Sequence, residues 1–178
     1  MDENLFWHML SSSKSDSRKS FMDNLINELS NLSYDEIYDF EIILTKKMKE
    51  LCTWDCFGAL LAIEIVTDDG HFNDFRSWII SEGQDFFEEF KRSADATASK
   101  LYEKSELHGN LGLQSLQLAT FLAMRVKVGS DNFIDLRDTA FSSGFTYGST
   151  NELAGNIVYE AELPIRFSKI WALFQEQN

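Results

Sequence analysis

Proline and glycine are scarce in this sequence. One proline, Pro164, and nine glycines occur among the 178 residues. These two residues interrupt helices, and they also build the many turns that a β-sandwich or β-barrel requires. Their scarcity disfavours an all-β architecture and favours a fold made of helices.

Cysteine and histidine are equally sparse. The two cysteines, Cys52 and Cys56, stand four residues apart, and two thiols do not make the disulfide framework of a small secreted protein. A metal site would need further soft ligands, but the three histidines, His8, His71 and His108, are widely separated in the chain. We therefore expect two buried thiols, no metal site and no cofactor.

Positive charge is in short supply. The chain has 16 Lys and Arg against 29 Asp and Glu, which gives a net charge of −13. Because affinity for nucleic acid rests on cationic neutralisation of phosphates, we expect no nucleic-acid partner. The imbalance is largest in residues 51–100, where a cationic partner would be attracted. The alternative is that the acidity serves solubility alone.

The sequence also lacks long apolar runs. Its N-terminus, from Met1 to Trp7, contains two acidic residues and no cationic segment of the kind that precedes a signal peptide. No run approaches the ~18 apolar residues of a membrane-spanning helix. We therefore expect a cytoplasmic protein that does not enter membranes.

Apolar and aromatic residues, in contrast, are plentiful. The hydrophobic fraction is 44%, with 15 Phe and 4 Trp. This composition is typical of a packed globular protein, and 178 residues are enough for one hydrophobic core. We predict a single helical domain over residues 1–178.

The first half of the chain shows helical periodicity. Apolar residues recur at intervals of three and four over 3–10 and 18–32, and Ser33 with Glu36 forms a capping box that opens a third helix. Residues 53–66 are nearly all apolar and predict a buried central helix, in which Gly58 allows a neighbour to approach closely. Two further helices are expected between His71 and Arg92, separated by Gly83, which suits a helix C-terminus.

The second half shows a less regular pattern of apolar residues. Residues 93–107 predict either a helix or a connector, and 113–128 a helix in which 125–128 alternates like a strand. A loop-rich segment follows at 139–155, then 157–159 resembles a short strand, and Pro164 opens a last helix. We expect a mainly α fold, a multi-helix orthogonal bundle with a short β or irregular element in the C-terminal half. The fold of 108–163 and the role of 139–155 are not assigned by the sequence.

Several short motifs in the first half resemble the DUF4240 family, bacterial domains of uncharacterised function. The resemblance covers roughly residues 3–92, and 93–178 are expected to pack on that part. It implies a mainly helical fold and no agreed activity, cofactor or catalytic residue. The residues that carry it are Phe6-Trp7, Glu36-Ile37 with Phe40, Trp54-Asp55 with Ala59 and Ala62, Asp68-Asp69-Gly70, Phe72, Asp74-Phe75-Arg76, Trp78, Ile80 and Gly83.

The densest group of polar residues lies within this match, from Asp68 to Arg76. We expect Asp69 to cap the helix that begins near His71, Gly70 to supply the turn, and Asp68 or Asp74 to pair with Arg76. The spacing is not that of a calcium loop. The alternative is a ligand site, in which Arg76 would bind a carboxylate or phosphate with Asp68 or Asp69 as further anchors.

A second candidate surface follows Gly83. Its acidic residues share one face of the predicted helix, where they are either a solvated face or a docking site for a basic protein. They are Glu82, Asp85, Glu88 and Glu89.

No motif indicates catalysis, since the chain has neither a Gly-x-Ser-x-Gly elbow nor a phosphate-binding loop. Its small size and charge favour a non-catalytic acidic binding protein, specifically an immunity-type inhibitor of a cationic toxin. The alternative is a small-ligand sensor or an uncharacterised enzyme, with a pocket around Arg76 between its helix and residues 139–155.

Overall fold

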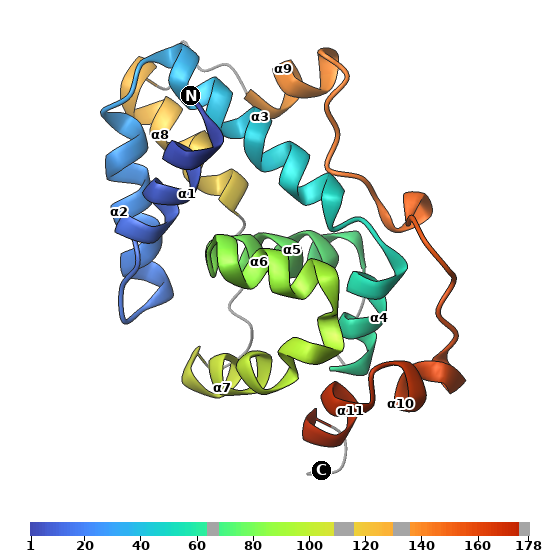
Figure 1. The fold of residues 1–178 in the computed structure, drawn as a ribbon. Coiled ribbons are helices and arrows are strands. Elements are labelled where there is room, and N and C mark those ends of the chain that lie inside the picture. Colours follow the sequence, from blue (N-terminus) through green and yellow to red (C-terminus); the bar gives the residue numbers. More distant parts are fainter. Residues whose placement is uncertain (64–67, 109–115, 130–135, 175–178) are drawn as a thin grey trace.

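A computed structural model of the chain describes residues 1–63, 68–108, 116–129 and 136–174. It is mainly α, as the sequence predicts, and its helices run in several directions (Figure 1). No described helix has both the length and the hydropathy needed to cross a membrane. The helices of the first half are α1 (Glu3–Ser12), α2 (Arg18–Ser30), α3 (Tyr34–Glu50), α4 (Trp54–Ala62), α5 (Asp69–Ser81) and α6 (Gln84–Arg92). The later elements are η1 (Ala94–Thr97), α7 (Ala98–His108), α8 (Leu116–Val128), α9 (Leu136–Ser142), η3 (Thr150–Glu152), η4 (Glu160–Glu162), α10 (Leu163–Arg166) and α11 (Ser168–Phe174).

Side-chain caps set where the early helices begin. The Glu36 N–H donates to Ser33 Oγ (3.3 Å), and the Ser33 N–H donates to Glu36 Oε2 (2.8 Å), which confirms the predicted capping box. At the start of α2 the Ser17 side chain accepts the Ser20 N–H, and at the start of α4 the Thr53 side chain accepts the Cys56 N–H. Each cap satisfies an N–H that the first turn of a helix leaves without an intrahelical acceptor.

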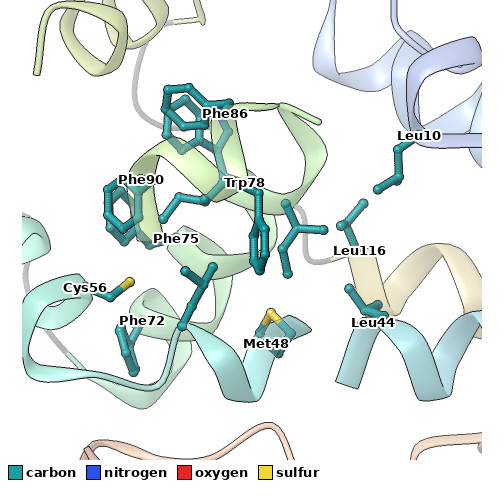
Figure 2. Packing of buried hydrophobic residues seen from close by; sticks show 14 of the residues in the cluster. Leu10, Leu44, Met48, Cys56, Phe72, Phe75, Trp78, Phe86, Phe90 and Leu116 are labelled. Atoms are coloured by element: carbon teal, nitrogen blue, oxygen red, sulfur yellow. The ribbon is translucent and has the colours of Figure 1, made fainter. Parts of the chain in front are cut away.

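Helix α5 lies at the centre of the core. It contacts α3, α4, α6 and α8, and its apolar residues belong to one cluster that reaches from Phe6 to Ile170. Figure 2 shows side chains from α1, α3, α6 and α8 gathered around Trp78 of α5. The Trp78 ring lies 6.1 Å from that of Phe75 and 5.7 Å from that of Phe86. The aromatic residues of the stretch after Gly70 therefore fill the core.

Gly58 of α4 allows the close approach that the sequence predicts. A methyl group at this position would lie 2.6 Å from Cε2 of Phe167 and 3.2 Å from Cγ1 of Val158. Both neighbours are buried side chains of the C-terminal part. The glycine therefore lets that part pack directly on the backbone of α4. Residues 64–66, the end of the helix predicted there, lie outside the described residues.

The two predicted strands in the second half are wrong. Residues 125–128 complete α8, where the Gly129 N–H donates to Arg125 O and the side chain of Val126 is exposed, and 157–159 form no strand. One isolated β-bridge joins Thr53 to Ala154 among the described residues. The helix predicted after Pro164 is divided at Phe167 into α10 and α11, because Phe167 departs from helical geometry (φ −122°, ψ 47°).

After α9 the chain runs in an extended course beside α3 and α4 and then reaches α10 (Figure 1). We call residues 145–154 the strap. The strap brings the loop-rich segment, whose role the sequence does not assign, against the ends of α3 and α5. It is therefore part of the candidate site.

Candidate functional site

Asp68, and not Asp69, caps α5. Its Oδ1 atom accepts the His71 N–H at 2.8 Å and lies 2.8 Å from His71 Nδ1. The hydrogen bond from the His71 backbone lowers the pKa of Asp68. The expectation that Asp69 caps the helix and Gly70 forms the turn is wrong, because the helix begins at Asp69 and Gly70 lies in its first turn.

Asp69 is instead a link between α5 and the strap. Its Oδ1 atom accepts the backbone N–H of Thr150 at 2.8 Å. This hydrogen bond lowers the pKa of Asp69 because it favours the ionised carboxylate. One of the two carboxylates considered as ligand anchors therefore caps a helix, and the other holds the strap.

Arg76 is fully buried and forms no ion pair with a carboxylate among the described residues. The expected pairing with Asp68 or Asp74 is therefore wrong. The guanidinium instead donates to main-chain carbonyl groups from two other parts of the chain. Nη1 donates to Met48 O (2.9 Å) and Tyr147 O (2.5 Å), and Nη2 donates to Gly148 O (3.0 Å).

The other two N–H groups of Arg76 are used within α5. Nη2 donates to Asn73 Oδ1, and Nε donates to Phe72 O at 3.4 Å. The guanidinium carbon also lies 4.2 Å from the centre of the Phe72 ring. All five N–H groups of the side chain therefore have an acceptor inside the protein. In this arrangement none is left for an external carboxylate or phosphate.

Burial lowers the pKa of Arg76, because removing a guanidinium from water disfavours its charged form. The carbonyl dipoles around it compensate for part of that cost. They come from the end of α3 and from the strap, so the charge is solvated only when all three segments are in place. Arg76 therefore holds α5, α3 and the strap together.

The strap is also held by residues from the end of α3 to the start of α4. The Trp54 N–H donates to Ala154 O (2.9 Å), and the Ala154 N–H donates to Cys52 O (3.0 Å). Lys49 Nζ lies 2.6 Å from a carboxylate oxygen of Glu152. These contacts fix both the strap's backbone and one of its side chains.

Both cysteines are free and buried, as the sequence predicts. Burial raises the pKa of the Cys52 thiol and of the Cys56 thiol, because the loss of hydration disfavours the thiolate more than the nearby charge of Arg76 favours it. Cys52 lies under the strap, and its Sγ atom is 3.4 Å from Ser149 O. The two thiols are packing residues in a reduced state.

A hollow of about 440 Å³ lies between α5 and residues 138–152, the two segments between which the alternative ligand pocket is expected. Asp69 lines it, but Arg76 and Asp68, the other expected anchors, do not. The rings of Phe141 and Tyr147 meet edge to face in its wall, with centres 5.1 Å apart. The carboxylates of Asp69 and Asp138 also line it. Its wall thus combines aromatic and polar groups.

Glu41 of α3 contacts Tyr147 and is not among the residues that the sequence patterns single out. It is fully buried, and its carboxylate accepts hydrogen bonds from the Tyr147 hydroxyl and from Thr120 Oγ1, the latter at 2.6 Å. The signal was present, because Glu41 interrupts the apolar stripe of α3 between Ile37 and Leu44. A carboxylate at such a position requires buried polar partners.

Among the described residues no group of three or more His, Cys, Asp or Glu side chains could hold a metal ion. A family model described as "Protein of unknown function (DUF4240)" matches residues 1–126. The chain belongs to this family. The match extends beyond residue 92, where the resemblance in the sequence ended, through α7 and most of α8. No curated protein and no solved structure matches the chain.

The DUF4240 match includes Arg76 and its acceptor on α3, but it ends before the strap. Arg76 therefore links the DUF4240 part to a C-terminal part that the family model does not match. The lining of the hollow likewise comes from both parts, with Asp69 on one side and Tyr147 on the other.

The acidic residues after Gly83 lie near α6, within the DUF4240 match. Asp85 is exposed, whereas Glu88 lies 3.2 Å from Lys91 Nζ, and Glu89 pairs with Lys100. Lysines therefore neutralise part of this face. It is less acidic than its sequence suggests.

Glu82 is the C-cap residue of α5 and lies outside α6, so the expectation that it shares the face of that helix is wrong. Its backbone carbonyl accepts a hydrogen bond from Lys14 Nζ at 2.8 Å. Lys91 also lies 2.7 Å from Glu50 of α3. Lys91 of α6 itself, with Lys14 and Lys100 from outside the helix, thus reaches carboxylates and a carbonyl around α6.

Proposed function

We propose that this protein is a non-catalytic binding protein that captures a basic protein partner. Its more specific form is an immunity-type inhibitor that covers a cationic bacterial toxin in the cytoplasm. The observation that carries the proposal is the charge of the folded chain, 29 carboxylate residues against 16 Lys and Arg. Even if each cation neutralised one carboxylate, thirteen carboxylates would remain, and their field attracts a basic protein.

The contacts of the described residues support a role for the surface rather than for the polar groups of α5. Arg76 uses all five N–H groups inside the protein, and Asp68 and Asp69 hold a helix end and the strap. These are the side chains that a ligand site on α5 would need. A partner that is held by surface charge does not need to contact Arg76, Asp68 or Asp69.

Affinity purification from the native host, at about 0.05 M and about 0.5 M salt, tests the proposal. We expect one stoichiometric protein with a basic isoelectric point, released at the higher salt because screening weakens exposed charge pairs. An unrelated acidic protein of similar charge is the control bait, since it reports capture by charge alone.

The toxin-specific form has its own test. The recovered protein, expressed alone, should arrest growth, and co-expression of this chain should restore it. A partner without toxicity would restrict the proposal to protein binding. Recovery of no stoichiometric basic protein, or of the same proteins by both baits, would refute it.

The hollow between α5 and residues 138–152 favours a second candidate function, the binding of a small ligand. Its volume of about 440 Å³ is within the usual range of ligand sites. A screen of metabolites by thermal shift tests this function. A true ligand should raise the Tm of the wild type but not that of Asp138→Asn, whereas Asp85→Asn, on α6, should respond as the wild type does.

A further inference from the structure

Three large apolar side chains lie exposed within nine residues of the C-terminal part. Ile157 is 51% exposed, Tyr159 63% and Ile165 83%. We call these three residues the C-terminal apolar surface. Isolated exposed apolar residues are common on proteins, but a group of them is typical of an interaction site.

The same segment is anchored on its inner side. Val158, Leu163 and Phe167 are each no more than 5% exposed and belong to the core. The chain here alternates between buried and exposed apolar residues. The segment is therefore packed against the core through Val158, Leu163 and Phe167, and its other apolar side chains face solvent.

Hydrogen bonds hold this segment in one shape. Arg166 Nη1 donates to Asn156 O (3.2 Å) and Ile157 O (3.1 Å), and Nη2 lies 2.8 Å from Asp55 Oδ1 on α4. The Tyr159 N–H donates to Glu162 Oε2 at 3.1 Å. A surface fixed before binding loses little conformational entropy when a partner docks on it.

The charge around the surface indicates the kind of partner. Two carboxylates, Glu160 and Glu162, lie between the exposed residues in the chain, and the nearest cation, Arg166, is paired with Asp55. Glu160 and Glu162 are exposed beside the apolar residues. A second copy of the chain would place its own carboxylates opposite these, whereas a basic partner would complement them.

We propose that the C-terminal apolar surface is the place where the basic protein partner docks. Tyr159 and Ile165 enter an apolar recess of the partner, and Glu160 faces its cations. This inference rests on the proposed function, and it moves the docking site away from the α6 face, where lysines neutralise Glu88 and Glu89. The surface lies beyond residue 126, outside the DUF4240 match.

The test uses the protein that the wild type recovers from the native host, re-expressed and purified, as the probe. The double variant Tyr159→Ser with Ile165→Ser should bind it at least about tenfold more weakly, since central apolar residues dominate interface energies. Val126→Ser is the matched control, because Val126 is 69% exposed on α8, away from α10 (Figure 1). Its affinity should stay within about twofold of the wild type. The side chains of Tyr159, Ile165 and Val126 are all exposed, so far-UV circular dichroism should show that each variant is folded.

A second pair of variants separates the two acidic faces. Glu160→Gln and Asp85→Asn each remove one exposed carboxylate, the first beside the apolar surface and the second on α6. Glu160→Gln should slow association by about twofold or more at low salt, and Asp85→Asn should slow it less.

Each other outcome overturns the proposal in a distinguishable way. If the double variant binds the recovered partner as tightly as the wild type does, the docking surface is refuted. The recovery of that partner would still support the proposed function. Recovery of no stoichiometric basic protein would refute both. A dimer of the wild type in light scattering that the double variant loses would show that a second copy covers the surface.

Discussion

Arg76 brings a charged group into the centre of the protein without a carboxylate to neutralise it. Three of its five hydrogen bonds reach carbonyl groups of Met48, Tyr147 and Gly148, which lie far from it in sequence. A buried guanidinium costs several kcal/mol unless its donors are satisfied. The folded state is therefore stable only when α3 and the strap place these carbonyl groups around Arg76.

Arg76→Met should lower the free energy of unfolding by about 3 kcal/mol, because three buried carbonyls lose their donor. Arg92→Met is the matched control, since Arg92 is exposed at the end of α6, and it should change stability by less than about 0.5 kcal/mol. Urea unfolding followed by tryptophan fluorescence measures both. Similar small losses in the two variants would show that Arg76 does not hold the three segments together.

Gly58→Ala tests the packing of the C-terminal part on α4. Alanine favours a helix by about 1 kcal/mol over glycine, but here its methyl group would lie 2.6 Å from the buried Phe167 ring. Overpacking of this kind costs about 1–3 kcal/mol, so we expect a net loss of stability. Thermal unfolding measures it.

The double variant Gly58→Ala with Phe167→Leu should lose less stability than the sum of the two single variants, because the smaller side chain makes room for the methyl group. Additive losses would show that the Phe167 ring does not cause the effect.

Among the elements, the strap depends most on contacts distant in sequence. Arg76, Asp69 and Lys49 each hold it, and all three lie at least 70 residues earlier in the chain. The strap passes close to Cys52 at Gly148, where an added methyl group would lie 2.6 Å from Cys52 Sγ. The strap therefore owes its shape to α3 and α5.

Gly148→Ala and Gly144→Ala form a matched pair for the strap. Both glycines have positive φ, +74° and +86°, but only Gly148 has neighbours within 4 Å of an added methyl group. Gly144→Ala should cost about 1 kcal/mol from backbone strain, and Gly148→Ala about 3 kcal/mol from strain and collision. Urea unfolding measures both. Equal losses would show that the strap can move away from Cys52 without cost.

At the scale of the whole molecule, opposing effects determine how stability depends on pH. Hydrogen bonds from Thr150 and Lys49 lower the pKa values of Asp69 and Glu152, so their stabilisation is present at neutral pH and is lost as the pH falls below about 4. Burial raises the pKa of Asp74, whose contribution is present at low pH and is lost as the pH rises. Repulsion within a chain of net charge −13 also grows as the pH rises.

The Tm should therefore pass through a maximum near about pH 5, between the loss of these carboxylate contacts in acid and the growth of repulsion above it. Added salt should raise the Tm at pH 7 because it screens the repulsion. Calorimetry from pH 3 to pH 8 measures both effects. A Tm that rises steadily up to pH 8 would show that long-range repulsion contributes little.

The helix that carries the candidate site was within reach of the sequence, but the partners of its polar groups were not. The helix of Arg76 follows from local patterns, whereas its N-cap was assigned to the wrong carboxylate, and Arg76 does not line the hollow. The acceptors of Arg76 could not be predicted, because carbonyl groups are present at every residue and carry no sequence signal. The cap was predicted at Asp69 but lies at Asp68, because adjacent carboxylates fit a helix start equally well until the first residue of the helix is known.

The sequence by itself determined the mainly α fold, the helices of the first half with the capping box of α3, and the burial of their apolar residues. These features depend on neighbours three or four residues apart, which the sequence displays directly. Only the tertiary structure decided that Arg76 binds carbonyls of α3 and the strap, that lysines neutralise part of the α6 face, and that Tyr159 and Ile165 are exposed. Those outcomes depend on the path of the chain between residues tens of positions apart, which local patterns do not encode.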